Sequence, residues 1–330
     1  MFNKVFIEND LGDYKETKEL LSKIKYKELV QINRFDDVFE KVKKPYLQKR
    51  KNLNLFLAKK RGQIVKEAPD AYGLSDSKHY YFVHAYNCIY ECEYCYLQGY
   101  FNSPDLVWFI NHDEIINEID NVSKRNPGAW FHAGEFSDSL ALSHFTNEIP
   151  KYHRYFKNNK TAKLELRTKS ANIKSIENLE PIENMFITFS LSPDDMAKKI
   201  DRKASPIKHR LLSIQKLDEL GFKIGIHLDP IVLSDDWKNS YQKLISDLSL
   251  HIELGHISFF SIGVVRFTKD VFHTFSTNYP DSLIKTSSFI KSFDNKVRYP
   301  RPVRKNALRF VKESLIHYGA NESKIYECME

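Results

Sequence analysis

The chain of 330 residues has few glycines, few cysteines and no long hydrophobic run. None of its apolar stretches approaches the roughly 18 residues that a membrane-spanning helix needs. The best candidate, Ile257–Val265, has the length of a buried strand. The N-terminal residues contain no apolar core of signal-peptide length. We therefore expect a cytoplasmic protein that does not associate with a membrane.

The chain has only 4 cysteines, and three of them, Cys88, Cys92 and Cys95, lie in one short loop. Thiols stay reduced in the cytoplasm, so a disulfide framework is not expected. The spacing C-x3-C-x2-C instead indicates that the three thiolates bind a metal or a metal-containing cofactor.

The chain carries no strong excess of charge of one sign. Lys and Arg number 50 against 43 Asp and Glu, which gives a formal net charge of +7. This balance favours an anionic partner such as nucleic acid only weakly, because many soluble enzymes are equally basic. Two basic segments, Lys41–Lys66 and Lys296–Lys312, are either solvated surface or faces that contact phosphates.

The first 75 residues are predicted to form a small β-α-β unit that ends in a basic segment. Val5–Glu8 and Glu28–Ile32 have the pattern of strands, and Thr17–Lys25 has the pattern of a helix. We expect this unit to be an N-terminal extension of the main domain.

Residues 76–275 are predicted to form the main α/β domain. Its clearest helix begins at Ser205–Pro206, an N-cap followed by proline, and ends at Gly221. Strands that alternate with helices indicate parallel βα units. Six strands are too few for a closed eight-fold barrel, so an open partial barrel or a doubly wound sheet is expected. The predicted strands are His79–Ala85, Ala129–His132, Lys163–Thr168, Met185–Leu191, Phe222–Leu228 and Ile257–Val265.

Residues 276–330 are predicted to be a C-terminal extension that closes the barrel. Pro300 and Pro302 indicate a loop or a hairpin in the basic segment. A helix over Ala307–Tyr318 and a strand-like tail, Lys324–Cys328, should follow.

The cysteine loop follows the first predicted core strand, so it should lie at the carboxyl end of that strand. Three thiolates can hold three corners of a 4Fe-4S cluster and leave the fourth iron open to a ligand that is not protein. The alternative is a structural zinc site completed by His84. The spacing differs from the paired C-x2-C form that is typical of structural zinc.

The motif C-x3-C-x2-C, with Tyr94 between its last two cysteines, resembles that of the radical S-adenosylmethionine superfamily. The resemblance implies a partial (βα)6 barrel that holds a 4Fe-4S cluster on Cys88, Cys92 and Cys95. It also implies that S-adenosyl-L-methionine binds the fourth iron and yields a 5′-deoxyadenosyl radical. An electron donor such as flavodoxin or ferredoxin would then be a partner.

More specifically, the chain resembles the spore photoproduct lyase family over about residues 50–330. The cluster loop reads CYLQ, and five further motifs follow in the same order and at similar spacing. The segments that carry the resemblance are Cys92–Gln98, Ser137–Asp138 with His144–Thr146, Thr168–Ser170, Phe189–Asp194, Ser205–Pro206 and Arg266–Lys269.

The resemblance implies a role for each matching residue. Ser137, Lys169 and Ser190 would hold the amino-acid part of the cofactor, where a lysine can pair with a carboxylate. Tyr94 would lie near the adenine and Tyr96 near the substrate, although both could simply pack around the cluster. The candidate substrate contacts are Arg266, Arg301 and Arg304.

The chain departs from the family at one position. Spore photoproduct lyases carry a cysteine two residues before the serine-aspartate pair, and that thiol returns a hydrogen atom to the substrate. Here Glu135 stands there. The pair Gly134–Glu135 resembles the superfamily motif in which a glutamate receives the cofactor amine. The only remaining thiol, Cys328, is either a replacement donor or an incidental residue near the terminus.

Three functions follow from this sequence. The first is a lyase-like radical enzyme that acts on nucleic acid, with thymine photoproducts in DNA as the candidate substrate, where the base would have to be flipped out. The second is the same enzyme chemistry on a peptide or a small molecule. The third is a non-catalytic iron–sulfur or zinc protein that binds nucleic acid.

Overall fold

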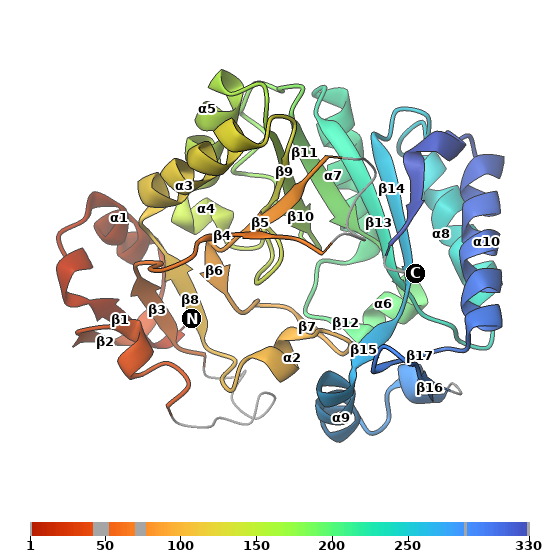
Figure 1. Ribbon diagram of the computed structural model, residues 1–330, viewed down its shortest axis with the longest axis horizontal. Coiled ribbons are helices and arrows are strands. Elements are labelled where there is room, and N and C mark those ends of the chain that lie inside the picture. Colours follow the sequence, from red (N-terminus) through yellow and green to blue (C-terminus); the bar gives the residue numbers. More distant parts are fainter. Residues whose placement is uncertain (1, 42–52, 70–76, 287–288, 329–330) are drawn as a thin grey trace.

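The computed structural model describes residues 2–41, 53–69, 77–286 and 289–328. Much of the basic segment Lys41–Lys66 therefore lies outside the described residues. Two sheets organise the chain, one over the N-terminal part and one through the main domain (Figure 1). No helix in these ranges is both long and apolar enough to cross a bilayer.

The first sheet has five strands in the order β2-β1-β3-β8-β6. Helix α1 (Lys15–Lys23) joins the parallel strands β1 and β2, which confirms the predicted β-α-β unit. The sheet also includes β8 and β6, which follow residue 75, so a domain boundary at that residue stays a prediction. The bounds of its strands are Phe2–Glu8 (β1), Tyr26–Ile32 (β2), Leu55–Ala58 (β3), Ala85–Tyr86 (β6) and Leu106–Phe109 (β8).

The second sheet has eight strands in the order β18-β14-β13-β11-β10-β9-β5-β4 and is curled into a half-barrel (Figure 1). Its six middle strands are parallel and in chain order, as the alternation of strands and helices predicts. β4 pairs antiparallel with β5, and β18 pairs parallel with β14. The strands are Val65–Glu67 (β4), His79–Phe82 (β5), Trp130–His132 (β9), Lys163–Thr168 (β10), Met185–Ser190 (β11), Lys223–Ile231 (β13), Phe259–Val264 (β14) and Ile325–Glu327 (β18).

Helices cover the outer face of the half-barrel (Figure 1). α7 buries one stripe of Ile207, Leu211, Ile214 and Leu217, and Gly221 follows it with a φ of 89°, as predicted for a C-cap. The helices are His112–Arg125 (α3), Ser143–Thr146 (α4), Ile149–Asn158 (α5), Asp194–Ile200 (α6), Ile207–Glu219 (α7), Trp237–Ser249 (α8) and Arg301–His317 (α10).

The inner face, which carries Glu165, Thr188 and His227, is polar at mid-height. Glu165 Oε1 accepts hydrogen bonds of 2.7 Å from Thr188 Oγ1 and from His227 Nε2, and its other oxygen bonds to His132. Burial alone would raise the pKa of Glu165, but the Arg167 guanidinium and the two histidines hold it well below its usual range. Both oxygens of this carboxylate are hydrogen-bonded within the protein, which makes this layer inside the half-barrel rigid.

The remaining elements are mostly short. A three-stranded sheet, β15-β17-β16, precedes the last helix. The loop or hairpin expected at Pro300 and Pro302 was wrong, because both prolines lie at the start of α10. The predicted start of the last helix at Ala307 was wrong, because α10 begins at Arg301 with Pro302 in its first turn, where proline is tolerated. The elements are Glu91–Cys92 (β7), Leu97–Tyr100 (α2), Asp201–Arg202 (β12), Arg266–Thr268 (β15), Lys269–Asn278 (α9), Ile290–Lys291 (β16) and Lys296–Arg298 (β17), with 3₁₀ turns at Asn9–Leu11, Phe35–Asp37, Leu283–Thr286 and Glu322–Lys324.

Gly225 of β13 lies where three strands approach closely. A Cβ atom there would lie 2.8 Å from both Phe259 Cζ and Thr188 Cγ2. We expect Gly225→Ala to lower the free energy of unfolding by about 1–3 kcal/mol through overpacking. Gly255→Ala is the matched control, because the nearest atom to its Cβ would be 3.7 Å away. Urea denaturation that gave equal values for both variants would contradict this packing.

Candidate functional site

The cysteine loop is held at both ends by hydrogen bonds and strand pairing. At its start, Asn87 has a φ of 63°, and its side-chain amide donates bonds of 2.7 Å to the carbonyls of Ser103 and Asp105. Further along, Cys92 in β7 pairs with Asp201 in the antiparallel strand β12. The loop is therefore a fixed structure at the carboxyl edge of the half-barrel.

Gln98, the last residue of the CYLQ motif, stabilises the loop through hydrogen bonds from its side chain to the loop backbone. Its buried side-chain amide donates to the carbonyls of Glu93 and Cys95, at 2.7 and 2.9 Å. Its oxygen accepts a bond of 2.9 Å from Asn278 of α9. A carboxylate could not make these donations, so a glutamine at this position fixes the chain between the second and third cysteines.

The three loop cysteines are half-buried. The backbone N–H of Tyr90 donates to Cys88 Sγ at 3.4 Å, a contact that suits a sulfur bearing negative charge. Burial raises the pKa of the Cys92 thiol, and Asp201 acts in the same direction, whereas the charge of Lys169 lowers it. The pKa of this thiol is raised on balance, so the charge of Lys169 offsets only part of the cost of a buried thiolate.

The donor set fits an iron–sulfur cluster better than a single zinc ion. Within the described ranges, no group of three or more His, Cys, Asp and Glu side chains is arranged to hold a metal ion. A single ion needs ligands that converge on one point, whereas a 4Fe-4S cluster takes each thiolate on a different iron. His84, the candidate fourth zinc ligand, is buried in a small pocket that it lines with His112 and Glu148.

A buried network fixes Tyr94, which lies between the second and third cysteines. The Tyr94 hydroxyl donates to Asp201 Oδ1, and the other oxygen of Asp201 accepts from Arg210 at 3.3 and 3.4 Å. Arg210 also donates bonds of 2.8 Å to the carbonyls of Ser190 and Ser205. The side chains of Asp201 and Arg210 are essentially inaccessible, so their charges compensate each other inside the protein.

Lys169 reaches the cysteine loop from the end of β10. Its backbone N–H donates to Asp138 Oδ2 at 2.7 Å, and Thr168 Oγ1 donates to Asp138 Oδ1 at 2.6 Å. Its Nζ lies 5.5 Å from the centre of the Tyr94 ring. Asp138 therefore orients the strand end, and the structure brings Lys169, Tyr94 and Cys92 together.

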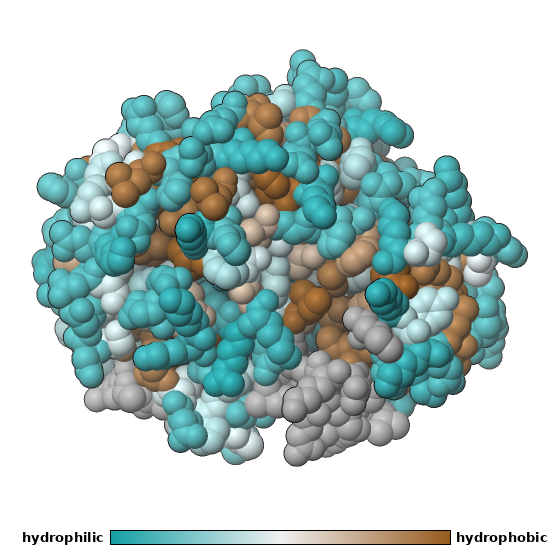
Figure 2. Space-filling view, turned by 180° about the vertical axis from the view of Figure 1, so that it is seen from behind, coloured by the Kyte–Doolittle hydropathy of each residue, from teal (hydrophilic) through white to brown (hydrophobic). Residues whose placement is uncertain are grey.

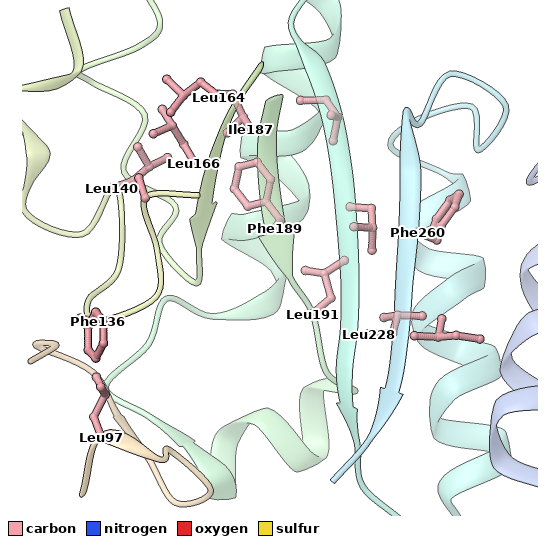
Figure 3. Packing of buried hydrophobic residues seen from close by; sticks show 14 of the residues in the cluster. Leu97, Phe136, Leu140, Leu164, Leu166, Ile187, Phe189, Leu191, Leu228 and Phe260 are labelled. Atoms are coloured by element: carbon pink, nitrogen blue, oxygen red, sulfur yellow. The ribbon is translucent and has the colours of Figure 1, made fainter. Parts of the chain in front are cut away.

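The segment after β9 contacts the cysteine loop through Phe136 and Tyr96. Phe136 lies beside Leu97 (Figure 3), and its ring centre is 5.1 Å from that of Tyr100. The Tyr96 hydroxyl donates to the carbonyl of Glu135. This contact sets Glu135 next to the loop, as expected for a residue that receives a cofactor amine, although that role stays a prediction.

Ser137 and Ser190 occupy different surroundings. Ser137 is half-buried and lines the small pocket that also contains His84 and His112. Ser190 is buried at the carboxyl end of β11, where its carbonyl bonds to Arg210. Both lie near the carboxyl ends of middle strands, and their predicted contacts with the cofactor remain to be tested.

Cys328 is a buried inner-face residue rather than a residue of a frayed terminus. Its N–H donates to the carbonyl of Ile262 at 2.8 Å, and Arg266 Nη2 lies 3.7 Å from its sulfur. Arg266 also binds both oxygens of Asp229, at 3.1 and 3.2 Å. Burial raises the pKa of the Cys328 thiol to about 11, so the sulfur stays protonated at neutral pH.

The two other arginines proposed as substrate contacts lie on α10. Arg301 is exposed at the first position of the helix. Arg304 is 6% exposed, and its Nη1 donates to the carbonyl of Tyr299 at 2.7 Å. Arg304 therefore anchors the helix, and a contact with a polyanion would require it to leave this position.

A family model described as spore photoproduct lyase matches residues 1–301. The chain belongs to the spore photoproduct lyase family. The spore photoproduct lyase of Bacillus subtilis (strain 168) is 25% identical over 214 residues, which is 63% of either chain. That of Clostridium acetobutylicum is 24% identical over 201 residues, 60% of this chain and 57% of the relative. These alignments span less than two thirds of the length of either relative.

Solved structures of spore photoproduct lyase share the fold. A variant with bound AdoMet and dinucleoside spore photoproduct matches with a TM-score of 0.83 at 18% identity, over 99% of this chain and 98% of that one. Another, complexed with dinucleoside spore photoproduct, matches with a TM-score of 0.82 at 19% identity. The likeness confirms the predicted α/β fold with a partial barrel.

The family motifs did not reveal every residue that shapes the site. Asp138 was noted only as part of a serine-aspartate pair, yet it accepts four hydrogen bonds that join two strand ends. Asp201 and Arg210 were not identified at all, because a charged pair within helical and loop segments has the pattern of an ordinary exposed pair. Only the tertiary structure shows that they are buried.

Removing the charge of Asp201 should leave Arg210 buried without a counter-charge. We expect Asp201→Asn to lower the free energy of unfolding by about 3–5 kcal/mol. Asp247→Asn is the control, because its pair with Lys243 is exposed and its loss should cost about 0.5 kcal/mol or less. Urea denaturation of both variants tests this, and similar losses would show that the Asp201 pair is not a buried anchor.

Proposed function

We propose that this protein is a radical S-adenosylmethionine enzyme of the spore photoproduct lyase type that acts on a damaged base in DNA. The observation that carries the proposal is the convergence of Lys169, Tyr94 and the three loop cysteines at the carboxyl edge of the half-barrel. In α/β barrels this edge is where ligands bind.

The cluster and the cofactor, when bound, supply a carbon-centred radical that abstracts a hydrogen atom from the substrate. Cys88, Cys92 and Cys95 would hold three irons. Lys169 would pair with the cofactor carboxylate, and Glu135 would accept from its amine, both as charge-assisted hydrogen bonds.

The other residues of the site position these groups. Gln98 and the β7–β12 pairing keep the cysteine loop rigid. The Tyr94 ring, held through Asp201, offers a flat apolar surface on which an adenine can stack. Ser137 and Ser190 would complete the contacts to the amino-acid part of the cofactor.

A DNA lesion is the substrate that the family favours. Solved structures of spore photoproduct lyase contain dinucleoside spore photoproduct. A base in a duplex would have to leave the stack to reach the inner face of the half-barrel. Figure 2 shows one side of the molecule, a largely hydrophilic surface on which some hydrophobic residues gather near the centre. Arg266, on the inner face, is the candidate contact.

Cys328 is the proposed source of the hydrogen atom that ends the reaction. A protonated thiol gives up hydrogen to a carbon-centred radical more readily than a carboxyl such as Glu135 does. The S–H bond would break as the product C–H bond forms, and hydrogen returned from the cleaved cofactor would restore the thiol. The position of Cys328 beside Arg266 on the inner face supports this role.

The decisive test is loss of the cluster. We expect Cys92→Ala to retain no intact cluster, against about four irons per chain in the parent, and to form no 5′-deoxyadenosine under anaerobic reducing conditions. Iron analysis and chromatography measure these quantities. Cys328→Ser is the matched control and should keep the iron and the cleavage reaction. Formation of 5′-deoxyadenosine by Cys92→Ala would refute the proposed function.

A second test follows the hydrogen atom into the product. Thiol hydrogens exchange with solvent, so oligonucleotides containing spore photoproduct that are repaired in D₂O should carry deuterium in the thymine product. We expect Cys328→Ser to cleave the cofactor normally but to lose most of the repair yield and of the deuterium. Unchanged repair by this variant would exclude Cys328 as the donor. Cofactor cleavage without repair by the parent protein would indicate a substrate other than this lesion.

A further inference from the structure

Three charged residues, two in β10 and one directly after it, share one face of the sheet. Side chains alternate along a strand, so Glu165, Arg167 and Lys169 project to the inner face of the half-barrel. Leu164 and Leu166, which alternate with them, are fully buried in the hydrophobic core (Figure 3). Arg167 therefore lies between the layer around Glu165 and the lysine that would hold the cofactor carboxylate, about 6.6 Å of strand below that lysine.

A glycine at the end of the neighbouring strand β9 allows a close approach to Arg167. A Cβ atom at Gly134 would lie 2.9 Å from Arg167 Cβ and 3.1 Å from the carbonyl oxygen of Arg167. Gly134 directly precedes Glu135, the candidate acceptor for the cofactor amine. Arg167 thus packs against the segment that would hold one end of the cofactor.

The contacts between Arg167 and Glu165 are long for an ion pair. Arg167 Nε and Nη2 lie 3.2 and 3.3 Å from the oxygens of Glu165, whereas charge-assisted hydrogen bonds are usually about 2.7–2.9 Å long. Glu165 also accepts hydrogen bonds of 2.7 Å from Thr188 and His227. The Arg167 side chain is 26% exposed. Its guanidinium can therefore turn towards a ligand while Glu165 keeps its shorter hydrogen bonds.

The charge of Arg167 acts across the inner face of the half-barrel. Burial acts to raise the pKa of Asp229 on β13, whereas Arg266 and, more weakly, Arg167 lower it. Burial raises the pKa of the Cys328 thiol to about 11, and Arg167 is among the charges that oppose this. A base bound on the inner face would therefore have Arg167 on one side and the thiol on the other.

The charges of this layer balance. Arg167 is paired with Glu165, and Arg266 is paired with Asp229. A phosphate would add a negative charge beside two carboxylates, which repel it. A neutral ligand with carbonyl groups would keep the balance and could still accept hydrogen bonds from a guanidinium.

We propose that Arg167 binds the substrate by donating hydrogen bonds to a carbonyl oxygen of the damaged pyrimidine base. This inference rests on the proposed function, because it needs such a base on the inner face. Every pyrimidine base carries a carbonyl group, so the contact holds and orients the base rather than choosing among pyrimidines. Its place below Lys169 puts the oriented base next to the cofactor.

The first test measures binding of dinucleoside spore photoproduct without a linking phosphate to the cluster-loaded protein, by titration calorimetry. We expect Arg167→Lys to bind this probe at least about tenfold more weakly, because lysine lacks the planar fork of donors. Lysine keeps a positive charge beside Glu165, so the midpoint of urea denaturation should not change. The rate of cofactor cleavage at saturating substrate should also stay that of the parent.

The second test replaces the carbonyl oxygens of the probe by sulfur, one at a time. Sulfur is a weak hydrogen-bond acceptor. We expect one thio analogue to bind the parent protein at least about tenfold more weakly than the probe does, and Arg167→Lys to lose this discrimination. A merely structural role of Arg167 would not depend on one atom of the ligand. The measurement on the parent stays decisive even if the variant is unstable.

The matched control is Arg125→Lys, because Arg125 is exposed on α3, where it bonds to the carbonyl of Asn121 at 3.0 Å. It should bind the probe as the parent does. Equal binding of the probe by the parent and Arg167→Lys, or of all thio analogues by the parent, would overturn the proposal. A loss confined to a probe that keeps the linking phosphate would also overturn it, because Arg167 would then bind the phosphate. Absence of 5′-deoxyadenosine from the dithionite-reduced parent would refute the proposed function rather than this contact.

Discussion

The architecture of the site depends on one buried ion pair. Asp201 and Arg210 neutralise each other where water is excluded, and each uses its remaining hydrogen-bonding capacity on a different part of the site. Asp201 reaches Tyr94 in the cysteine loop, and Arg210 holds the carbonyl at the end of β11. The cysteine loop also packs Leu97, Tyr94 and Cys95 in or against the hydrophobic core, and the ion pair adds to this packing in fixing the position of the loop.

This arrangement explains why the chain tolerates a half-open sheet. An open barrel leaves polar groups of its inner face exposed to a lumen, and here they satisfy one another around Glu165. Above that layer, Arg167, Asp229 and Arg266 stand closer to the cysteine loop, where a ligand can meet them. The structure therefore separates a saturated lower layer, which provides stability, from an upper layer in which Arg266 and Asp229 are paired with each other.

Much of the fold was predictable from the sequence because the strands are strongly hydrophobic and their helices have clear ends. The helix that begins at Ser205–Pro206 and ends at Gly221 is an example, and so is the cysteine loop, whose spacing identifies its chemistry. The start of α10 was misjudged because two prolines look like a loop when their place in a first turn is unknown. The burial of Asp201, Arg210 and Arg304 could not be predicted, since charge alone does not show which side of a segment faces the core. The burial of Cys328 was missed for a similar reason, because strand pairing with β14 draws it inside.

The layer of side chains around Glu165 also limits how deeply a ligand can enter the half-barrel. The carboxylate oxygens of Glu165 already bond to His132, Thr188 and His227, so this layer closes the interior of the half-barrel below it. A ligand would then lie nearer to the carboxyl ends of the strands than Glu165 does. Selectivity among ligands would then depend on the segments at the carboxyl edge of the half-barrel rather than on the strands. Exchanging those segments between members of the family should change which substrate reacts, while the strands of the half-barrel stay the same.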